Sequence, residues 1–257
     1  MGANPTAEYL DIASRFDHAL RECVALSIRC AGVRSPTSKH FYASTLFTTL
    51  CTRCSSIPVL MPYSPWSAKT IDLWDYASIA VLSRAVFELR LTFFYLCGEI
   101  CDEDEWNARS TLFNLHDCMS RLRLFQDMEN AADTAGFAAQ AATLRQLLEV
   151  NPFFRRLPEK SQRNFLKGRE SHFEPLESIA ERCGTPRRWY RIAYRLASNH
   201  AHVLLMSFYR MGEQERGRGI HSEIEEAYSK MFIEFVSDLM AEALAEMRAL
   251  FTGVVKT

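Results

Sequence analysis

Apolar residues recur at intervals of three and four along most of the chain, a spacing that is typical of amphipathic helices. The sequence lacks short alternating runs bounded by Asn-Gly or Asp-Gly turns, which would indicate β-hairpins. The pattern therefore predicts an all-α fold. We expect helices over residues 7–30, 38–55, 70–100, 103–130, 138–150, 159–166, 175–182, 186–211 and 222–251.

Proline, glycine and acidic residues mark several ends of these helices. The three prolines between positions 58 and 65 are expected to end the second helix, and Asn151-Pro152 ends another. Gly184-Thr185-Pro186 supplies a glycine after one helix and a proline at the start of the next. The acidic run Asp102–Glu105 favours capping over metal binding, because negative charge stabilises a helix N-terminus.

The composition indicates a globular protein. Apolar residues make up 48% and charged residues 24% of 257 residues, which is enough chain to bury a core of its own. Thirty Lys and Arg balance 31 Asp and Glu, so the total charge attracts neither nucleic acid nor an anionic membrane. A partner of this kind must therefore bind a local patch. We expect a single domain over residues 1–257.

The sequence also gives an expected compartment. No basic segment followed by an apolar stretch stands at the beginning, and no run reaches the roughly 18 apolar residues of a membrane helix. We therefore expect a cytoplasmic protein without a membrane segment, whose eight cysteines are reduced. Cys51-Thr-Arg-Cys54 has metal-ligand spacing, but a structural zinc site needs a second pair or nearby histidines. Because nucleotide-binding and hydrolase motifs are missing too, we expect no metal and no cofactor.

Positive charge is concentrated in one segment. Residues 155–195 contain 11 Lys and Arg against 5 Asp and Glu. Arg188, Arg191 and Arg195 lie in this segment with aromatic residues between them, and the guanidinium group matches phosphate oxygens in pairs. One interpretation is a surface for RNA or another phosphate-bearing ligand. The other is a solvated face that is paired with neighbouring acids.

One predicted helix concentrates polar groups among small and apolar residues. At about 100° per residue, Arg195 and His202 differ by about 20° and share a face. Tyr194 and Ser198 approach His202 in steps of four. His200 falls about 140° from Arg195, on another surface. We therefore predict that His202, and not His200, is the catalytic histidine. The alternative is that both histidines are structural.

Two short patterns carry a resemblance to a known group of families. Tyr194-x-x-x-Ser198-x-x-x-His202 resembles a signature of helical families of unknown function that are related to the HEPN superfamily. Upstream, Arg84-Ala-Val-Phe-Glu88 is similar to the Arg-x-x-x-Glu element of the same families. The resemblance implies a HEPN-like helical bundle with additional helices.

The resemblance implies an architecture and a reaction. The HEPN-like core would span about residues 70–252, with the N-terminal helices at residues 7–56 packed on it. HEPN ribonucleases carry Arg-x(4 to 6)-His and cleave RNA without a metal, which implies catalytic roles for Arg195 and His202. Arg195 would stabilise charge on the scissile phosphate, and His202 would act as general base or acid at the ribose 2′-hydroxyl.

The resemblance also implies supporting residues and a partner. Members usually pair two such helices across a homodimer, which would place two copies of each catalytic residue in one composite site. Arg84 and Glu88 would form an ion pair that orients this face. The residues that would bind substrate are Tyr194, Ser198, Arg191, His200 and Arg188.

Three classes of function follow from this reading. The first is a metal-independent endoribonuclease of a toxin or defence type. The second is a noncatalytic bundle that binds or scaffolds a protein partner. It is favoured by the neutral net charge and by Leu196, because active HEPN nucleases commonly have a polar residue after the arginine. The third is an enzyme with a small-molecule pocket near Glu88 in the bundle.

Overall fold

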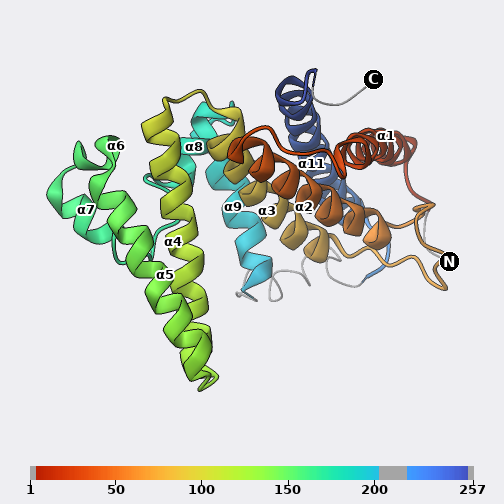
Figure 1. The fold of residues 1–257 in the computed structure, drawn as a ribbon. Coiled ribbons are helices and arrows are strands. Elements are labelled where there is room, and N and C mark those ends of the chain that lie inside the picture. The colour runs from red at the N-terminus through yellow and green to blue at the C-terminus, as the bar shows by residue number, and fades with distance from the viewer. Residues whose placement is uncertain (1–3, 203–218, 254–257) are drawn as a thin grey trace. The chain divides into compact units, whose positions relative to one another are not determined.

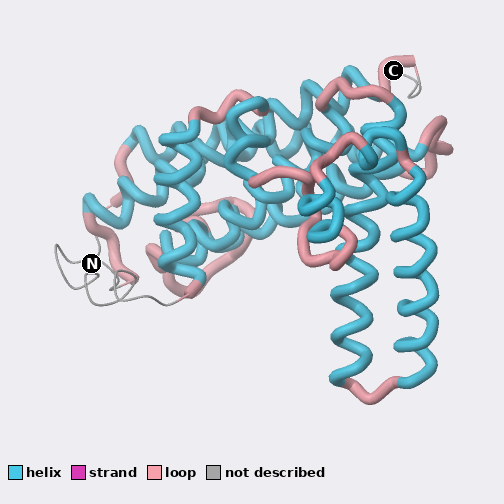
Figure 2. Tube along the Cα trace, turned by 90° about the vertical axis from the view of Figure 1, so that its left-hand side faces the viewer, coloured by secondary structure: helices cyan, strands magenta, loops and turns pink. Residues whose placement is uncertain are grey.

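The computed structural model describes residues 4–202 and 219–253, and within them the backbone is helical or irregular, without a strand (Figures 1 and 2). The predicted all-α fold is confirmed for these residues. The helices are α1 (Ala7–Cys30), α2 (Ser38–Leu60), α3 (Tyr76–Phe93), the π-helix η1 (Phe94–Gly98), α4 (Glu103–Asp127), α5 (Ala131–Val150), α6 (Pro152–Arg155), α7 (Glu159–Phe165), α8 (Leu176–Arg182), α9 (Arg187–Ala201) and α11 (Glu223–Leu250).

Several long helices begin where a polar side chain accepts a hydrogen bond from a free backbone N–H group. Thr6 accepts from the third residue of α1 at 3.1 Å, and Asp75 accepts from the third residue of α3 at 3.0 Å. Asp102 accepts from the backbone N–H of Glu105 at 2.7 Å. The acidic run before α4 therefore caps a helix, as predicted.

Two helices are longer than the sequence predicts. α2 continues to Leu60 through Pro58, which lies in the last turn, where a missing backbone N–H removes a single helical hydrogen bond. α5 begins at Ala131 instead of residue 138, because Asn130 accepts a hydrogen bond from Asp133 at 3.2 Å and alanines follow. Capping and alanine content, not apolar spacing, decide this helix start.

The chain forms two compact units. The first comprises Met1–Gly98 together with Ala180–Thr257, and the second comprises Glu99–Ile179. The second unit is thus inserted, in the order of the sequence, between the two parts of the first. The single domain expected over residues 1–257 stays a prediction.

Helix α3 is central in the first unit. It packs against α2, α9 and α11, and α11 also packs against α1 (Figure 1). Phe16, Phe47, Phe87 and Val236 are buried between these helices. Each such side chain stabilises the fold by about 1.5–3 kcal/mol through removal of apolar surface from water. The position of α9 is therefore set by its contact with α3.

A charged side chain also lies inside the first unit. Arg90 of α3 is 1% exposed, and it donates from Nη1 and Nη2 to the Glu246 carboxylate at 3.1 and 2.6 Å. Glu242 lies 3.4 Å from the same guanidinium group. Gly98 leaves room for this pair, because a Cβ there would collide with the carboxylate of Glu246. The bidentate ion pair joins α3 to α11.

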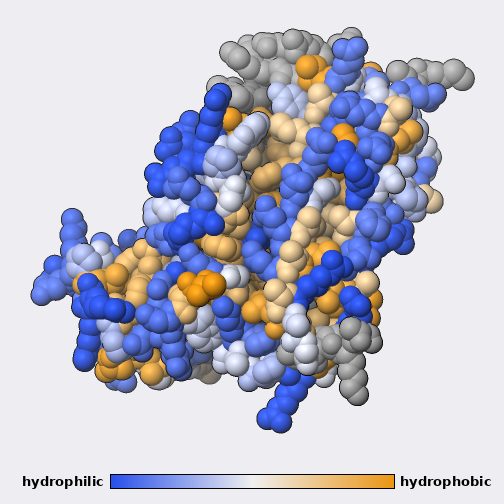
Figure 3. Space-filling model, turned by 90° about the horizontal axis from the view of Figure 1, so that it is seen from above, coloured by the Kyte–Doolittle hydropathy of each residue, from blue (hydrophilic) through white to orange (hydrophobic). Residues whose placement is uncertain are grey.

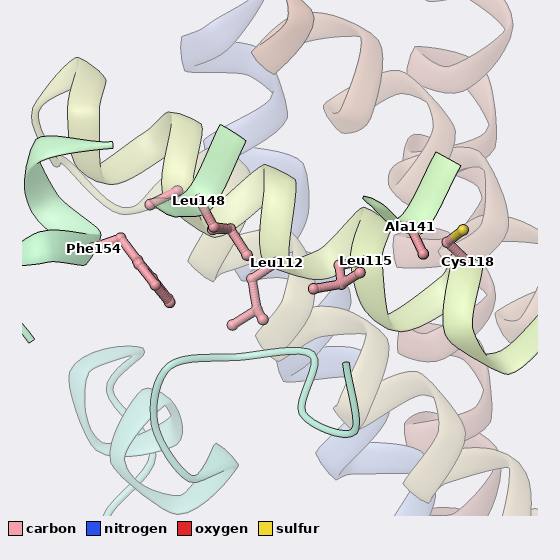
Figure 4. Close-up of a cluster of buried hydrophobic side chains, with 7 residues drawn as sticks. Leu112, Leu115, Cys118, Ala141, Leu148 and Phe154 are labelled. Atoms are coloured by element: carbon pink, nitrogen blue, oxygen red, sulfur yellow. The ribbon is translucent and has the colours of Figure 1, made fainter. Parts of the chain in front are cut away.

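The second unit is built on an antiparallel hairpin of α4 and α5 (Figure 2). Its core is a cluster of side chains at the facing sides of these helices and on α6, of which Figure 4 labels six. The cluster consists of Ala108, Leu112, Leu115, Cys118, Ala141, Leu148 and Phe154. Because the two helices share these residues, they are expected to fold together.

Two polar side chains are enclosed in the second unit. Arg109 of α4 is 5% exposed and forms ion pairs with Glu99 at 2.7 Å and with Glu105. His172 hydrogen-bonds through Nδ1 with the hydroxyl of Ser171 at 2.9 Å. Burial, with smaller contributions from His116 and Arg109, lowers the pKa of His172 to about 4. The imidazole is therefore neutral at pH 7.

The eight cysteines are free thiols. Cys51 and Cys54, the pair with metal-ligand spacing, are both buried inside α2. Burial raises the pKa of Cys51 to about 11, and it raises the pKa of Cys54 well above its ordinary value. Because zinc binds the thiolate form, this environment disfavours a metal site. In the described part of the chain, no group of three or more His, Cys, Asp or Glu residues is placed to bind a metal ion.

The surface mixes polar and apolar residues, and Figure 3 shows apolar side chains between polar ones on the face that it presents. Trp189 and Ile192 are among the large apolar side chains that remain exposed. Within the described ranges, no helix is both long enough and apolar enough to cross a membrane.

Candidate functional site

Helix α9 carries most of the residues that the sequence selects. It begins after Pro186, and Gly184 has a φ of +93°, a conformation that glycine adopts without strain and that turns the chain before the helix. The helix ends at Ala201, with His202 as its C-cap. The predicted helix extends to residue 211, and positions 203–211 lie outside the described residues.

One side of α9 is fixed to α3 by a polar network. Arg84 donates from Nε to Glu88 at 3.1 Å and from Nη2 to the hydroxyl of Tyr194 at 2.8 Å. The guanidinium carbon also lies 4.5 Å from the centre of the Tyr194 ring, which adds a cation–π contact. The structure thus joins three sequence-selected residues, and the ion pair expected between Arg84 and Glu88 is present.

Electrostatics explain why this network is stable. Arg84 is half-buried, which disfavours its charged form, but the carboxylate of Glu88 and the hydroxyl of Tyr194 outweigh that penalty and raise the pKa of Arg84. The guanidinium group therefore stays charged and remains bound to Glu88 and Tyr194. Arg84 and Glu88 therefore position α9.

Aromatic rings extend the same contact. The rings of Tyr190 and Tyr194 stack with centroids 5.4 Å apart, and Phe87 of α3 lies 5.6 Å from Tyr190. Ser198 donates its hydroxyl to the backbone oxygen of Tyr194 at 2.5 Å, so this hydroxyl is bound to the helix itself. Tyr190 and Phe87 were not predicted to be part of the site. The spacing of four between Tyr190 and Tyr194 could have indicated the stack.

The other side of α9 is basic and exposed. Arg188, Arg191 and Arg195 are all exposed, and their spacings of three and four place them along one side of the helix. Arg187, at the edge of this side, pairs with Glu181 at 2.7 Å. Guanidinium groups in a row at the surface can contact successive phosphates of a nucleic acid.

The two candidate histidines occupy different environments. His200 is half-buried, and its ring lies edge-on to Tyr76 of α3 with centroids 5.1 Å apart. His202 is exposed, and its backbone N–H donates to the oxygen of Ser198 at 3.0 Å. The two histidines thus differ in burial and in their neighbours, and the choice of His202 over His200 stays a prediction. Because α9 ends before His202, the angle between His202 and Arg195 expected for a continuous helix does not apply directly.

One of three comparisons with known proteins finds a match, to a protein family. Residues 40–219, more than half of the chain, match the Family of unknown function (DUF5677), and the chain belongs to this family. Arg84, Glu88 and the whole of α9 lie inside the matched range. No curated protein and no solved structure matches the chain.

Proposed function

We propose that this protein is a HEPN-like, metal-independent endoribonuclease that uses the exposed side and C-terminal end of α9. One observation carries the proposal: Arg188 and Arg195 are exposed along one side of α9, and the exposed imidazole of His202 stands at its end. Phosphate-binding cations and a group that transfers protons near neutral pH are what RNA cleavage without a metal requires.

The proposed reaction is an attack of the ribose on its own phosphodiester. The 2′-oxygen bonds to the adjacent phosphorus, while the imidazole of His202 takes the proton of the 2′-hydroxyl. The bond from phosphorus to the 5′-oxygen breaks, and a second protonated imidazole gives its proton to that oxygen. The products are a 2′,3′-cyclic phosphate and a 5′-hydroxyl end. Arg195 stabilises the charge that develops on the phosphate oxygens.

The remaining selected residues have binding and positioning roles in this proposal. Arg188 and Arg191 contact neighbouring phosphates, which sets the register of the RNA. Tyr194 belongs to the contact with α3, and together with Arg84 and Glu88 it holds α9 in place, whereas the hydroxyl of Ser198 is bound to the backbone of α9 itself. His200 lies at the same C-terminal end of α9.

The second imidazole comes from a homodimer in this proposal. Two α9 helices that face each other across a dimer axis would bring two copies of Arg195 and His202 to one RNA strand. A cytoplasmic toxin or defence protein that degrades RNA is the biological role that fits such a composite site.

A second candidate function uses the same surface without cleavage. His202 lies beyond the last residue of α9, and Leu196 follows Arg195 directly. A bundle that only binds a phosphate-bearing ligand or a protein partner needs the exposed arginines but no aligned histidine. The two functions therefore differ in what His202 contributes.

Cleavage of a labelled single-stranded RNA pool in EDTA tests the proposal. We expect the wild-type protein to release fragments with 2′,3′-cyclic phosphate ends, His202→Ala to abolish the release, and His200→Ala to retain it. Size-exclusion chromatography of each variant checks that the dimer persists. Intact RNA with the wild-type protein would overturn the nuclease proposal.

Binding measurements separate the second candidate from the first. Fluorescence anisotropy at several salt concentrations should show affinity that falls with salt, with a slope of about 0.7 for each phosphate contact to single-stranded RNA. We expect Arg188→Gln to reduce this slope and Arg34→Gln, an exposed arginine of α2's preceding loop, to leave it unchanged. Binding without cleavage would favour the noncatalytic function.

A further inference from the structure

The first unit contains a cavity that the proposed function does not use. It has a volume of about 540 Å³ and lies between α1, α9 and α11, which are labelled in Figure 1. Pockets of about 300–1,000 Å³ with mostly apolar walls are typical sites for small molecules. Trp189 and Ile192 of α9 and Met231, Phe235 and Leu239 of α11 supply apolar walls.

Trp189 makes this wall unusual. Its side chain is 59% exposed although it borders the cavity, and Ile192 beside it is 41% exposed. An exposed indole beside an apolar cavity offers a flat face for a ligand, and tryptophan is the preferred ring for contacts with cations. The basic side of α9 turns away from this wall, because Arg188 and Arg195 do not line the cavity.

The rim of the cavity is acidic. Glu234, Asp238 and Glu242 follow one another at intervals of four along α11 and all line the cavity. Glu234 pairs with Arg15 at 3.3 Å, and Glu242 lies 3.4 Å from Arg90. Asp238, between them, forms no ion pair with the described residues. Its charge is therefore available to a ligand.

Burial and neighbouring charge both act on these carboxylates. Burial raises the pKa of Asp238, and the charge of Glu234 raises it further. The pKa of Glu242 is also raised, chiefly by burial, in spite of the nearby guanidinium group of Arg90. Both raised pKa values mean that the ionised carboxylates are disfavoured, so a positive charge in the cavity would stabilise their ionised form. Lys230, which also lines the cavity, pairs with Glu8 and lies 3.7 Å from Glu226.

We infer that the cavity between α1, α9 and α11 binds a small amphiphilic cation, an apolar body of about one or two rings joined to an ammonium or guanidinium group. The apolar body lies against Trp189 and Phe235, and the cation contacts Asp238. The size of the cavity favours a small molecule over a protein segment, and the charge of the rim excludes anions. The site is separate from the exposed arginines of α9.

Calorimetric titration of the full chain with 4-phenylbutylamine tests this inference, with 4-phenylbutyrate as the matched anion. We expect one equivalent of the amine to bind and to raise the melting temperature, since a ligand stabilises the state it binds. The anion should bind at least about tenfold more weakly, because it meets the acidic rim without a counter-charge. Equal binding of the two probes, or no binding of the amine, would overturn the inference.

Matched variants locate the binding. Asp238→Asn should weaken the amine about threefold to fivefold, as loss of one partly solvated ion pair does, while Asp117→Asn, an exposed carboxylate of α4, should leave it unchanged. Ala227→Trp fills the cavity from α11 and Ala193→Leu fills it from α9, and each should abolish binding. Circular dichroism identifies any variant that fails to fold. If one blocking variant does not fold, amine binding to the other one tests the location of the site.

The same variants exclude other occupants. If both filled variants bind the amine as the wild type does, the site lies elsewhere and the inference is wrong. If an arginine-rich helical peptide binds and is blocked by Ala227→Trp, but 4-phenylbutylamine does not bind, the cavity is a protein-docking site and the small-molecule assignment is overturned.

Discussion

Arginine has opposite roles in two regions of the first unit, the contact between α3 and α11 and the exposed side of α9. Arg90 is enclosed and held by the two oxygens of Glu246, with Glu242 nearby. Arg188 and Arg195 are exposed, and among the described residues neither has an ion-pair partner. A buried guanidinium group must be paired, whereas an exposed one is hydrated and remains available to a ligand. The comparison separates an arginine that supports the fold from arginines that can act on a ligand.

The largest effect on stability is expected at the buried pair. Arg90→Met should lower the free energy of unfolding by about 3–5 kcal/mol, because it removes a buried guanidinium group and leaves the half-buried Glu246 without its bidentate partner. Chemical denaturation measures this change. Arg15→Met removes an exposed arginine with two carboxylate partners and should cost less than about 1 kcal/mol. Equal losses in the two variants would contradict the distinction.

A pH-dependent effect of similar origin is expected at His172 in the second unit. The folded pKa of about 4 lies below the ordinary value of 6.5, so the unfolded chain binds more protons between these values. Stability should therefore fall as the pH drops from about 6.5 to 4, by up to about 3 kcal/mol from this group, and should not change above that range.

The variant His172→Gln isolates this contribution from that of the carboxylates that titrate in the same range. Denaturation curves at pH 7 and pH 4.5 should show a smaller loss of stability on acidification for His172→Gln than for the wild type. A wild type and variant that lose the same stability would show that His172 is not enclosed.

A smaller effect is expected where α9 contacts α3. Tyr194→Phe removes the hydrogen bond from Arg84 but keeps the ring, and should lower the free energy of unfolding by about 1 kcal/mol. Tyr63→Phe, at an exposed loop position, is the matched control and should have no effect. Thermal denaturation compares the two. If Tyr194→Phe is as stable as Tyr63→Phe, the Arg84 contact does not fix α9.

The smallest effect on stability is expected on the basic side of α9. Arg188→Gln should change the free energy of unfolding by less than about 0.5 kcal/mol, since exposed positions away from caps and ion pairs tolerate substitution. The same variant should weaken RNA binding. Parallel denaturation and anisotropy measurements test both parts, and a large loss of stability would assign Arg188 to the fold.

Most of the helices could be predicted from the sequence, because the period of their apolar residues and their capping residues agree. α1 and α4 begin at the predicted residues 7 and 103, after the side-chain caps Thr6 and Asp102. The start of α5 was missed, because alanine carries no amphipathic signal. The ion pair of Arg90 with Glu246 was also missed, because 156 residues separate the partners and no local spacing records their contact.

The candidate site was predicted in part, for a similar reason. The spacing of four between Arg84 and Glu88 indicated their ion pair, which is local. The hydrogen bond from Arg84 to Tyr194 depends on the packing of α9 on α3, which the sequence does not specify. The end of α9 at Ala201 could not be inferred either, because no glycine or proline follows it closely.

The most direct test measures RNA cleavage in EDTA and the free energy of unfolding for Arg195→Gln, with Arg34→Gln as the exposed control. The account predicts that both variants unfold like the wild type, that Arg34→Gln cleaves RNA normally, and that Arg195→Gln does not cleave it. An Arg195→Gln variant that cleaves RNA at the wild-type rate, or that loses activity only because it unfolds, would contradict a role for the exposed side of α9 in RNA cleavage.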